Sequence, residues 1–387
     1  MPPKQLRQKL LILSVSAGAG HVRAAQAIEA AAKAAAPPLD TTHLDLLSIA
    51  PAEFRKFYGA QYLKLVEALP QLWSYLYAKT DRPSRNSLVG DLKRATEKFN
   101  LRKLDGEIAR IQPDVILCTH FLPAELLSRQ RAPRKAGTKN LPPLWVQVTD
   151  FDVHALWVHP YVDRYCVASD EVAFRLVDRG VAREKIVVSG IPVMPQFAAS
   201  PDRKTCAAEL GLDATKFTVL MMAGGGGVGA LDELAERVLR EPGPKFEKLQ
   251  LVTLAGRNEA LLKRLQALAK KHPGRLFPLG FTTTVERIMS AADLVITKPG
   301  GLSTSECLAK GKPMLLVSPI PGQEERNADY LLEAGAAVKA VDAATLSFKL
   351  RKLLEEPERL AAMSAASLRI RTPHAARDVV ALLSVTP

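Results

Sequence analysis

Short apolar runs of strand length alternate with stretches of helical periodicity along almost the whole chain of 387 residues. This alternation is typical of parallel-sheet α/β proteins, in which a helix follows each buried strand and covers the sheet. The pattern therefore predicts two doubly wound α/β domains. Six strands are expected in each, near residues 9–15, 41–46, 114–119, 144–149, 163–168 and 186–189, and near 218–223, 249–255, 275–279, 293–297, 313–317 and 336–340.

A stretch without clear β pattern separates the two sets of strands. Residues 190–213 contain three prolines and many small side chains, which is typical of an interdomain linker. We expect an N-terminal domain over 1–198, a linker over 199–213 and a C-terminal domain with C-terminal helices over 214–387. Doubly wound sheets bind ligands at the carboxyl ends of their strands, so the two domains are expected to face each other across a cleft.

Three glycine-rich loops follow predicted strands and lead into predicted helices. They read "SAGAGH" (16–21), "AGGGGVGALDEL" (223–234) and "TKPGGLSTSE" (297–306). Glycine allows a ligand close to the backbone, and the start of the next helix directs N–H groups at an anion. None matches the full dinucleotide fingerprint, and the first lacks the Lys-Ser/Thr of a P-loop. The loops indicate a phosphate-bearing ligand and disfavour a nicotinamide enzyme.

The third loop is followed by polar residues suited to a nucleotide sugar. Glu306 falls in the first turns of the helix after Gly300-Gly301, where its carboxylate suits the two hydroxyls of a ribose. The next predicted strand ends at "PIPGQEERNA" (319–328), whose Gln-Glu pair suits the hydroxyls of a hexose.

This passage resembles the donor site of the glycosyltransferases that make glycosyldiacylglycerols. They are the monogalactosyldiacylglycerol synthase and processive diacylglycerol β-glucosyltransferase group of glycosyltransferase family 28, relatives of the enzyme that adds N-acetylglucosamine to lipid I. The resemblance extends to 16–28, 149–169, 190–197 and 280–301. It implies the GT-B fold of two Rossmann-like domains, with the acceptor on the N-terminal domain and a UDP-sugar on the C-terminal domain.

The resemblance also implies roles for individual residues. The first loop has an alanine where the family often carries a third glycine, and it retains Gly18, Gly20 and the histidine as a phosphate or acceptor loop. The implied donor contacts are the diphosphate at Gly300, Gly301, Leu302 and Ser303, the ribose at Glu306, the sugar at Gln323 and Glu324 with Asn327 in support, the uracil at the backbone of Phe281, and the donor phosphates at Gly224, Gly225 and Gly226.

His21 is the candidate catalytic base. An acceptor alcohol must lose a proton as it attacks the anomeric carbon, and a histidine that titrates near neutrality suits that step. A helix N-terminus is expected to lower its pKa and so favour the neutral form. The resemblance assigns the matching histidine to this role, and the alternative is a histidine that caps a helix or packs in the core. One displacement inverts the anomeric carbon, so an α-linked donor gives a β-glycoside.

Asp150 and Asp152 form a D-x-D pattern, which other glycosyltransferases use to hold a divalent metal. Because the glycine loops already supply stabilisation for the leaving group, we expect no metal and no cofactor besides the donor. Asp150 is instead expected to orient His21 or the acceptor hydroxyl. His154 and His159 are candidates for either acceptor contacts or structural roles.

The positive charge of the chain, +13 overall, is concentrated in its N-terminal half. Residues 55–103 hold eleven Lys/Arg against four Asp/Glu, and 54–77 hold seven of the 22 aromatic residues. Aromatic rings among basic side chains suit an anionic membrane surface, whereas the alternative is an ordinary core helix. No nucleic-acid-binding motif is visible. The candidate membrane or acceptor contacts are Phe57, Tyr58, Tyr62, Trp73, Tyr77, Arg82 and Arg85.

The sequence thus predicts a UDP-hexose:1,2-diacylglycerol glycosyltransferase that uses UDP-glucose or UDP-galactose. The short apolar run near residue 10 is expected to be a buried strand rather than a signal peptide, and four scattered cysteines fit a reducing cytoplasm. We expect a peripheral enzyme on the inner face of the cell membrane. The alternatives are a transferase for a polyprenyl-linked acceptor, a UDP-sugar 2-epimerase on the same fold, and a UDP-sugar sensor without turnover.

Overall fold

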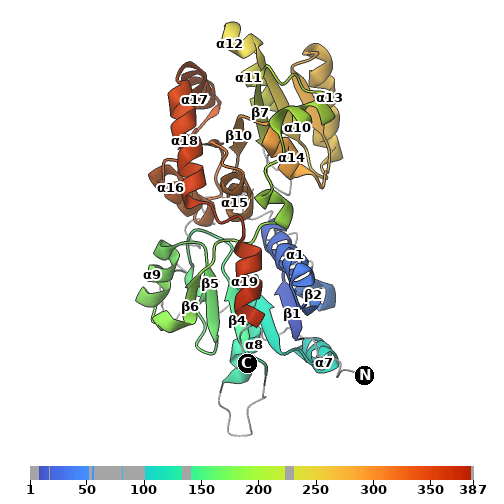
Figure 1. The fold of residues 1–387 in the computed structure, drawn as a ribbon, viewed down its shortest axis with the longest axis vertical. Helices are drawn as coiled ribbons and strands as arrows, with labels where there is room; N and C mark the ends of the chain where they lie inside the picture. Colours follow the sequence, from blue (N-terminus) through green and yellow to red (C-terminus); the bar gives the residue numbers. More distant parts are fainter. Residues whose placement is uncertain are drawn as a thin grey trace. The chain divides into compact units, whose positions relative to one another are not determined.

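A computed structural model of the chain describes residues 8–16, 18–51, 55, 81, 101–132, 141–222 and 231–384. These residues form two compact units (Figure 1). The first unit contains the described residues up to Pro195, together with Ile320–Gln323 and the chain from His374 onward. The second unit contains Gln196–Pro319 and Glu324–Pro373.

The first unit is built on a six-stranded parallel sheet. Its strand order is β2-β1-β3-β4-β5-β6. Strand β2 therefore lies on one side of β1, and β3 to β6 follow in sequence on the other side. The buried side chains of β1, β3 and β4 explain their nearly continuous apolar sequences, since a parallel sheet is covered on both faces. The strands are β1 (Lys9–Ser14), β2 (Asp40–Asp45), β3 (Val115–Cys118), β4 (Leu144–Gln147), β5 (Arg164–Val167) and β6 (Ile186–Val188).

Short helices connect these strands. They are α1 (Ala19–Ala34), α2 (Leu46–Ile49), α7 (Leu101–Ile111), α8 (Phe121–Arg131), η2 (Ala155–Trp157), α9 (Asp170–Asp178) and η3 (Arg183–Lys185). Helix α1 is rich in alanine, which lets it pack closely on the sheet. Its Ala25 and Ile28 join Leu10 and Ile12 of β1 in one buried cluster.

The second unit repeats the architecture with the strand order β12-β11-β10-β7-β8-β9. Its strands are β7 (Phe217–Met222), β8 (Leu249–Leu254), β9 (Leu276–Leu279), β10 (Leu294–Thr297), β11 (Met314–Leu316) and β12 (Ala337–Lys339). Its helices are η4 (Pro195–Ala198), α10 (Arg203–Glu209), α11 (Leu231–Leu239), α12 (Pro244–Glu247), α13 (Glu259–Lys271), α14 (Val285–Ala291), α15 (Gly301–Ala309), α16 (Gln323–Glu333), α17 (Ala343–Glu355) and α18 (Pro357–Ile370).

The predicted fold class is confirmed. All twelve predicted strands are present, and each lies within two residues of its expected bounds. Every strand pair of the two described sheets is parallel, as the alternation of apolar runs and helical segments indicated.

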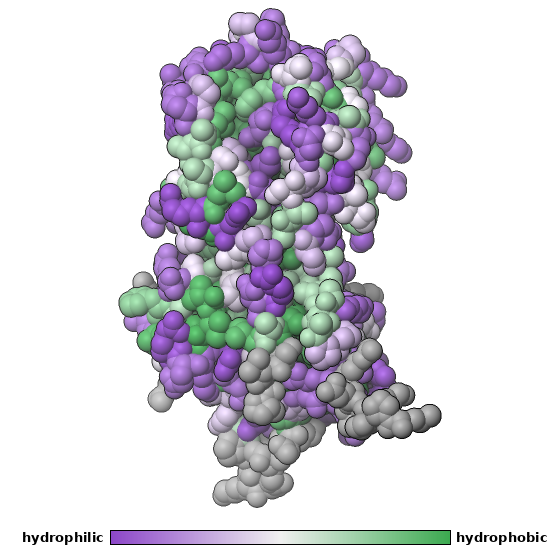
Figure 2. Space-filling model, viewed as in Figure 1, coloured by the Kyte–Doolittle hydropathy of each residue, from purple (hydrophilic) through white to green (hydrophobic). Residues whose placement is uncertain are grey.

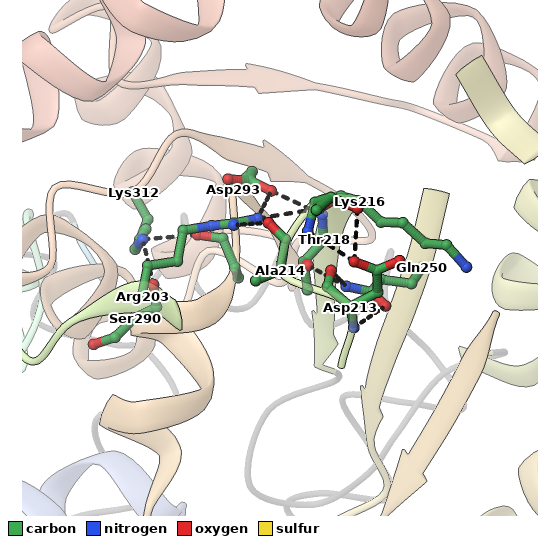
Figure 3. A network of polar contacts seen from close by, with 11 residues as sticks. Arg203, Asp213, Ala214, Lys216, Thr218, Gln250, Ser290, Asp293 and Lys312 are labelled. Carbon is green, nitrogen blue, oxygen red and sulfur yellow. Dashed lines mark hydrogen bonds and ion pairs between the residues drawn. The ribbon is translucent and has the colours of Figure 1, made fainter. Parts of the chain in front are cut away.

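The chain between the two predicted domains is itself folded. Residues 199–213, expected to be a linker, contain α10, and Arg203 at its start donates a hydrogen bond to Asp293 Oδ2 over 2.8 Å. That carboxylate also accepts the N–H of Thr218 at the start of β7. Figure 3 shows these residues in one polar network with Gln250 and Lys312. The segment is therefore attached to the amino edge of the second sheet.

The last helix also departs from the expected division. Helix α19 (Ala375–Ser384) was assigned by its sequence position to the C-terminal domain, but it belongs to the first unit. Its Val379 and Leu383 are fully buried in the cluster that contains Leu10 and Ile28. Apolar burial in the cluster shared with α1 and β1 accounts for this placement.

Candidate active site

The site in the first unit lies at the carboxyl ends of β1, β3 and β4. These strands are neighbours, and the order in which strands are added to the sheet reverses between β1 and β3, because β2 lies on one side of β1 and β3 lies on the other. Such a reversal separates the loops after the two strands and leaves room for a ligand. The loop after β1 leads through Gly18, the N-cap of α1, to His21. The prediction that His21 lies at the start of the first helix is confirmed.

Two threonines hold the His21 ring and its backbone. The Nδ1 atom of His21 lies 2.9 Å from the main-chain carbonyl oxygen of Thr119 and 2.9 Å from the hydroxyl oxygen of Thr149. The Thr119 hydroxyl in turn donates to the main-chain carbonyl of His21 over 2.9 Å. Sequence reasoning did not identify either threonine, although each is the last residue of a predicted strand, 114–119 or 144–149.

Aromatic rings surround the other faces of His21. The ring of His120 meets it edge to face, with the ring centroids 4.6 Å apart, and Trp157 lies at 6.2 Å. His120 also caps helix α8, because its Nδ1 atom accepts the N–H of Leu122. Phe121 completes the group through contacts with both His120 and Trp157. These rings pack against His21 and leave it partly exposed.

This environment changes the expected titration of His21. Burial lowers its pKa from the ordinary value of 6.5 to about 4, although the hydrogen bond to the Thr119 carbonyl acts in the opposite direction. Burial and then the neighbouring His21 hold the pKa of His120 well below its usual range. The expectation of a pKa near neutrality is therefore wrong. The expected lowering is present, but burial is its main cause.

The loop after β4 carries the acidic pair of the D-x-D pattern. Asp150 is buried and directly follows Thr149, so its role in catalysis stays a prediction. Asp152 is also buried and lies 3.4 Å from the guanidinium of Arg175 on α9. Among the described residues, no three His, Cys, Asp or Glu side chains come together as metal ligands do.

The two further histidines of this region have structural contacts. The Nδ1 atom of His154 accepts the N–H of Leu156 and caps η2. His159 exchanges main-chain hydrogen bonds with the Tyr165 hydroxyl, at 2.9 and 3.3 Å. Of the two roles left open for these residues, the described contacts favour the structural one.

In the second unit, the loop after β10 leads into a helix start without a side-chain cap. Gly300 is the N-cap of α15, with no side-chain cap and no acidic residue in the first turn. The first N–H groups of the helix therefore point outward without a side-chain partner. Asn327 on α16 steadies the loop by donating its Nδ2–H to the carbonyl of Pro299 over 3.1 Å.

Two buried carboxylates accompany this helix start. Glu306 lies on α15 itself, and Glu324 lies on α16. A Cβ atom placed on Gly300 would be 3.6 Å from the Glu324 Oε1 atom, so the two residues adjoin. The described contacts thus bring together three predicted donor residues, Gly300, Glu324 and Asn327. Gly301, Leu302 and Ser303 form the first turn of α15, and Gln323 is the first residue of α16.

Phe281 follows β9 at the carboxyl edge of the second sheet. Its ring is 62% exposed, and the guanidinium of Arg257 lies over it at 4.8 Å. Arg257 follows the adjacent strand β8, and sequence reasoning did not select it. The cation–π contact holds an exposed aromatic ring at the edge where a nucleotide is expected.

Some predicted site residues lie outside the described residues. They are Gly224, Gly225 and Gly226 of the second glycine loop, and the membrane candidates Phe57, Tyr58, Tyr62, Trp73, Tyr77, Arg82 and Arg85. Within the described residues, no helix is both long and apolar enough to cross a bilayer.

Exposed apolar residues of the first unit gather on α9 and β6. Phe174 is 71% exposed on α9, and Val177 lies one turn further along the same helix. Val188 is exposed on β6, the edge strand of the sheet. Figure 2 shows hydrophobic residues gathered over this part of the first unit.

Comparison with solved structures defines the class to which the fold belongs. MurG from Acinetobacter baumannii matches with a TM-score of 0.59 and 18% identity, covering 98% of this chain and 100% of that one. A UDP-GlcNAc 2-epimerase from Neisseria meningitidis matches with a TM-score of 0.62 and 15% identity, with the same coverage. Both likenesses show the GT-B fold alone, which transferases and epimerases share.

Sequence comparison is more specific. Residues 21–193 match the family described as monogalactosyldiacylglycerol synthase, and residues 218–380 match the glycosyltransferase family 28 C-terminal domain. A processive diacylglycerol beta-glucosyltransferase from Bacillus cereus is 30% identical over 375 residues, which is 96% of this chain and 92% of the relative. The chain belongs to this family of glycosyldiacylglycerol-synthesising glycosyltransferases.

Proposed function

We propose that the protein transfers a hexose from a UDP-sugar to the sn-3 hydroxyl of 1,2-diacylglycerol, with inversion at the anomeric carbon. The observation that carries the proposal is the match over 96% of the chain to a diacylglycerol beta-glucosyltransferase. The partly buried His21 at the carboxyl edge of the first sheet supports it, because it offers a base where an acceptor would bind.

The chemistry needs one proton acceptor. The acceptor alcohol gives its proton to His21 as its oxygen bonds to the anomeric carbon, and the bond from that carbon to the UDP oxygen breaks with its electron pair. A pKa of about 4 keeps His21 neutral at physiological pH, so the ring is ready to accept a proton. The product is a β-glycosyldiacylglycerol when the donor is α-linked.

The departing UDP needs stabilisation in the second unit. We infer that the uncapped start of α15 faces the diphosphate, since its free N–H groups and helix dipole favour an anion. Glu306 binds the ribose, while Glu324 and Gln323 contact the hexose and Phe281 meets the uracil. No metal or other cofactor takes part in this scheme.

A lipid acceptor requires contact with a membrane. We propose that the first unit lies peripherally on the inner face of the cell membrane, with an anionic lipid surface as its partner. The cluster of basic and aromatic residues over 54–103 and the exposed Phe174 and Val177 on α9 support this arrangement.

UDP-glucose is the donor to test first, because the Bacillus cereus relative is named a glucosyltransferase. UDP-galactose differs by the configuration of one hydroxyl group and is the second donor. A polyprenyl-linked acceptor or a 2-epimerase activity would give other products from the same donor class, and a sensor would give none.

The decisive experiment offers purified protein each UDP-hexose with vesicles of diacylglycerol and anionic lipid. Glycolipid is scored by thin-layer chromatography and mass spectrometry for the wild type, His21→Ala and a control, His374→Ala, which alters an exposed histidine on the surface. We expect a β-hexosyldiacylglycerol from the wild type and the control, and none from His21→Ala. Donor binding without any glycolipid from the wild type would contradict the proposal.

A further inference from the structure

The ring of His21 is held through one of its two nitrogens. Nδ1 has two oxygen partners at 2.9 Å, the main-chain carbonyl of Thr119 and the hydroxyl of Thr149. A carbonyl oxygen has no proton to donate, so the proton in that contact must belong to the imidazole. In the neutral ring, Nδ1 therefore carries the hydrogen and Nε2 keeps its lone pair.

The Thr119 contact is rigid because it is anchored on both sides. Its main-chain N–H donates to the carbonyl of Leu13 at the end of β1 over 2.9 Å, and its hydroxyl donates to the main-chain carbonyl of His21. One fully buried residue thus fixes both the ring of His21 and the backbone from which the ring projects.

Thr149 adds a second acceptor from the loop after the neighbouring strand β4, and this residue is also buried. Two oxygens sharing one N–H form a three-centre hydrogen bond. When Nε2 takes up a proton, the Nδ1–H becomes more positive, and both oxygens stabilise the new cation. A carboxylate has this role beside the histidine of a serine protease triad, whereas here neutral oxygens supply it.

His120 does not compete for the same function. Its own Nδ1 accepts the N–H of Leu122, so the neutral ring of His120 carries its hydrogen on Nε2. It is the titratable side chain that the described structure places against the His21 ring. The two histidines therefore have opposite tautomers, and only His21 is held as a proton acceptor at Nε2.

We propose that Thr119 and Thr149 are positioning residues that keep the proton of His21 on Nδ1 and so present Nε2 to the acceptor alcohol. The inference rests on the proposed function. The alcohol proton passes to Nε2, the alcohol oxygen bonds to the anomeric carbon, and UDP leaves with the electron pair of the broken bond. Removal of the Thr149 hydroxyl slows this step without changing donor binding.

The first test reads the tautomer directly. Protein labelled with ¹⁵N-histidine gives distinct nitrogen shifts and couplings for the two neutral tautomers, and His21→Gln identifies the His21 signals among the seven histidines. We expect the hydrogen on Nδ1 at pH 7. A hydrogen on Nε2 would overturn the inference, whether or not the enzyme is active.

The second test uses a pair of substitutions at Thr149. Thr149→Val keeps the shape and removes the hydroxyl, so we expect kcat to fall about fivefold, with KM for the UDP-sugar unchanged. Thr149→Ser restores the hydroxyl and should restore kcat. Thr253→Val is the matched control, because Thr253 is a buried threonine of the second unit whose hydroxyl has no hydrogen bond in the described structure.

The outcomes separate the two proposals. A Thr149→Ser variant as slow as Thr149→Val, or a Thr149→Val variant as fast as the wild type, would overturn the positioning role. If Thr149→Val fails to fold, the inference is still tested by the wild-type tautomer, expected with hydrogen on Nδ1, and by kcat of Thr149→Ser, expected to equal that of the wild type. A wild type that binds donor but forms no glycolipid would overturn the proposed function, while the tautomer measurement would stand on its own.

Discussion

The two units share one local structure but place different groups on it. In each, a strand ends in a glycine loop and a glycine N-caps the next helix, Gly18 before α1 and Gly300 before α15. Neither helix has a side-chain cap or an acidic residue in its first turn. In α1 the first turn carries His21, a titratable group held by β3 and β4. In α15 it carries small or apolar side chains, so the backbone N–H groups are the candidate anion-binding feature. The comparison suggests that the first unit performs proton transfer and the second performs anion binding.

The largest effect should come from the histidine. His21→Gln removes the base and should lower kcat by about 10³-fold, a typical contribution of a general base. Calorimetric titration with UDP should give the wild-type affinity, because the substitution leaves the second unit intact. A matching loss of UDP affinity would contradict the separation of roles.

At the ribose position we expect the substitution to weaken UDP binding, which His21→Gln should leave unchanged. Glu306→Gln replaces a buried carboxylate on α15, and the loss of charged hydrogen bonds to the ribose should weaken UDP binding about tenfold or more. Glu333→Gln, an exposed residue at the end of α16, is the control and should bind UDP normally. Equal binding by Glu306→Gln and the wild type would remove Glu306 from the donor site.

Gly300→Ala tests whether the loop glycine is needed by the ligand or by the fold. Its φ of −69° and ψ of 136° suit any residue, and the added Cβ would make an ordinary contact with Glu324. We therefore expect an unchanged melting temperature, with about tenfold weaker UDP binding because the methyl group occupies the path of the phosphate.

The matched control for Gly300→Ala is Gly311→Ala. Gly311 has a φ of +62°, and a Cβ there would lie 2.6 Å from the Leu368 side chain. That substitution should cost about 1–2 kcal/mol of stability. Its binding of UDP at low temperature should be normal. A Gly300→Ala variant that melts like Gly311→Ala would instead assign the glycine to the fold.

The smallest effect is a pH dependence of the stability of the first unit. The unfolded chain protonates His21 and His159 at the ordinary pKa of 6.5, but in the folded state burial lowers both to about 4. As the pH falls from 6.5 towards 4, the unfolded state binds more protons and the free energy of unfolding decreases. Urea unfolding at several pH values measures the slope. All three tryptophans, Trp73, Trp145 and Trp157, fall within the chain before Pro195, so their fluorescence reports on this unit.

His21→Gln should make that slope shallower, since it removes one histidine whose pKa is lowered in the folded state. His374→Gln, which changes an exposed histidine, should leave it unchanged. A slope that is the same in His21→Gln and in the wild type would show that His21 is accessible to protons in the folded state.

The strands and glycine loops could be predicted from the sequence because their signals are local. The buried strands read as continuous apolar runs such as "DVILCT" before Thr119 and "TVLMMA" in β7, and glycines punctuate the turns that follow. The position of His21 followed from the same pattern. These features depend on residues close together in the chain, so local composition and the spacing of apolar residues suffice to find them.

The contacts of His21 could not be predicted in this way. Thr119 and Thr149 lie 98 and 128 positions from His21, and they meet it only because β3 and β4 pair beside β1. The extent to which the His21 pKa is lowered also escaped prediction, because its main cause is burial in the folded chain rather than the helix start. Packing between distant segments therefore decides what the local motif can do.

The return of α19 to the first unit makes the second unit an insertion rather than an appended module. The chain enters it after Pro195 and leaves it before His374, apart from the short Ile320–Gln323 segment. A fragment ending at residue 198 would lack Val379 and Leu383 and would expose the apolar surface of α1 that they cover. Exchange of donor specificity between relatives would therefore require two junctions in the chain, with the native α19 retained. A fusion made at the predicted linker alone would carry the wrong final helix.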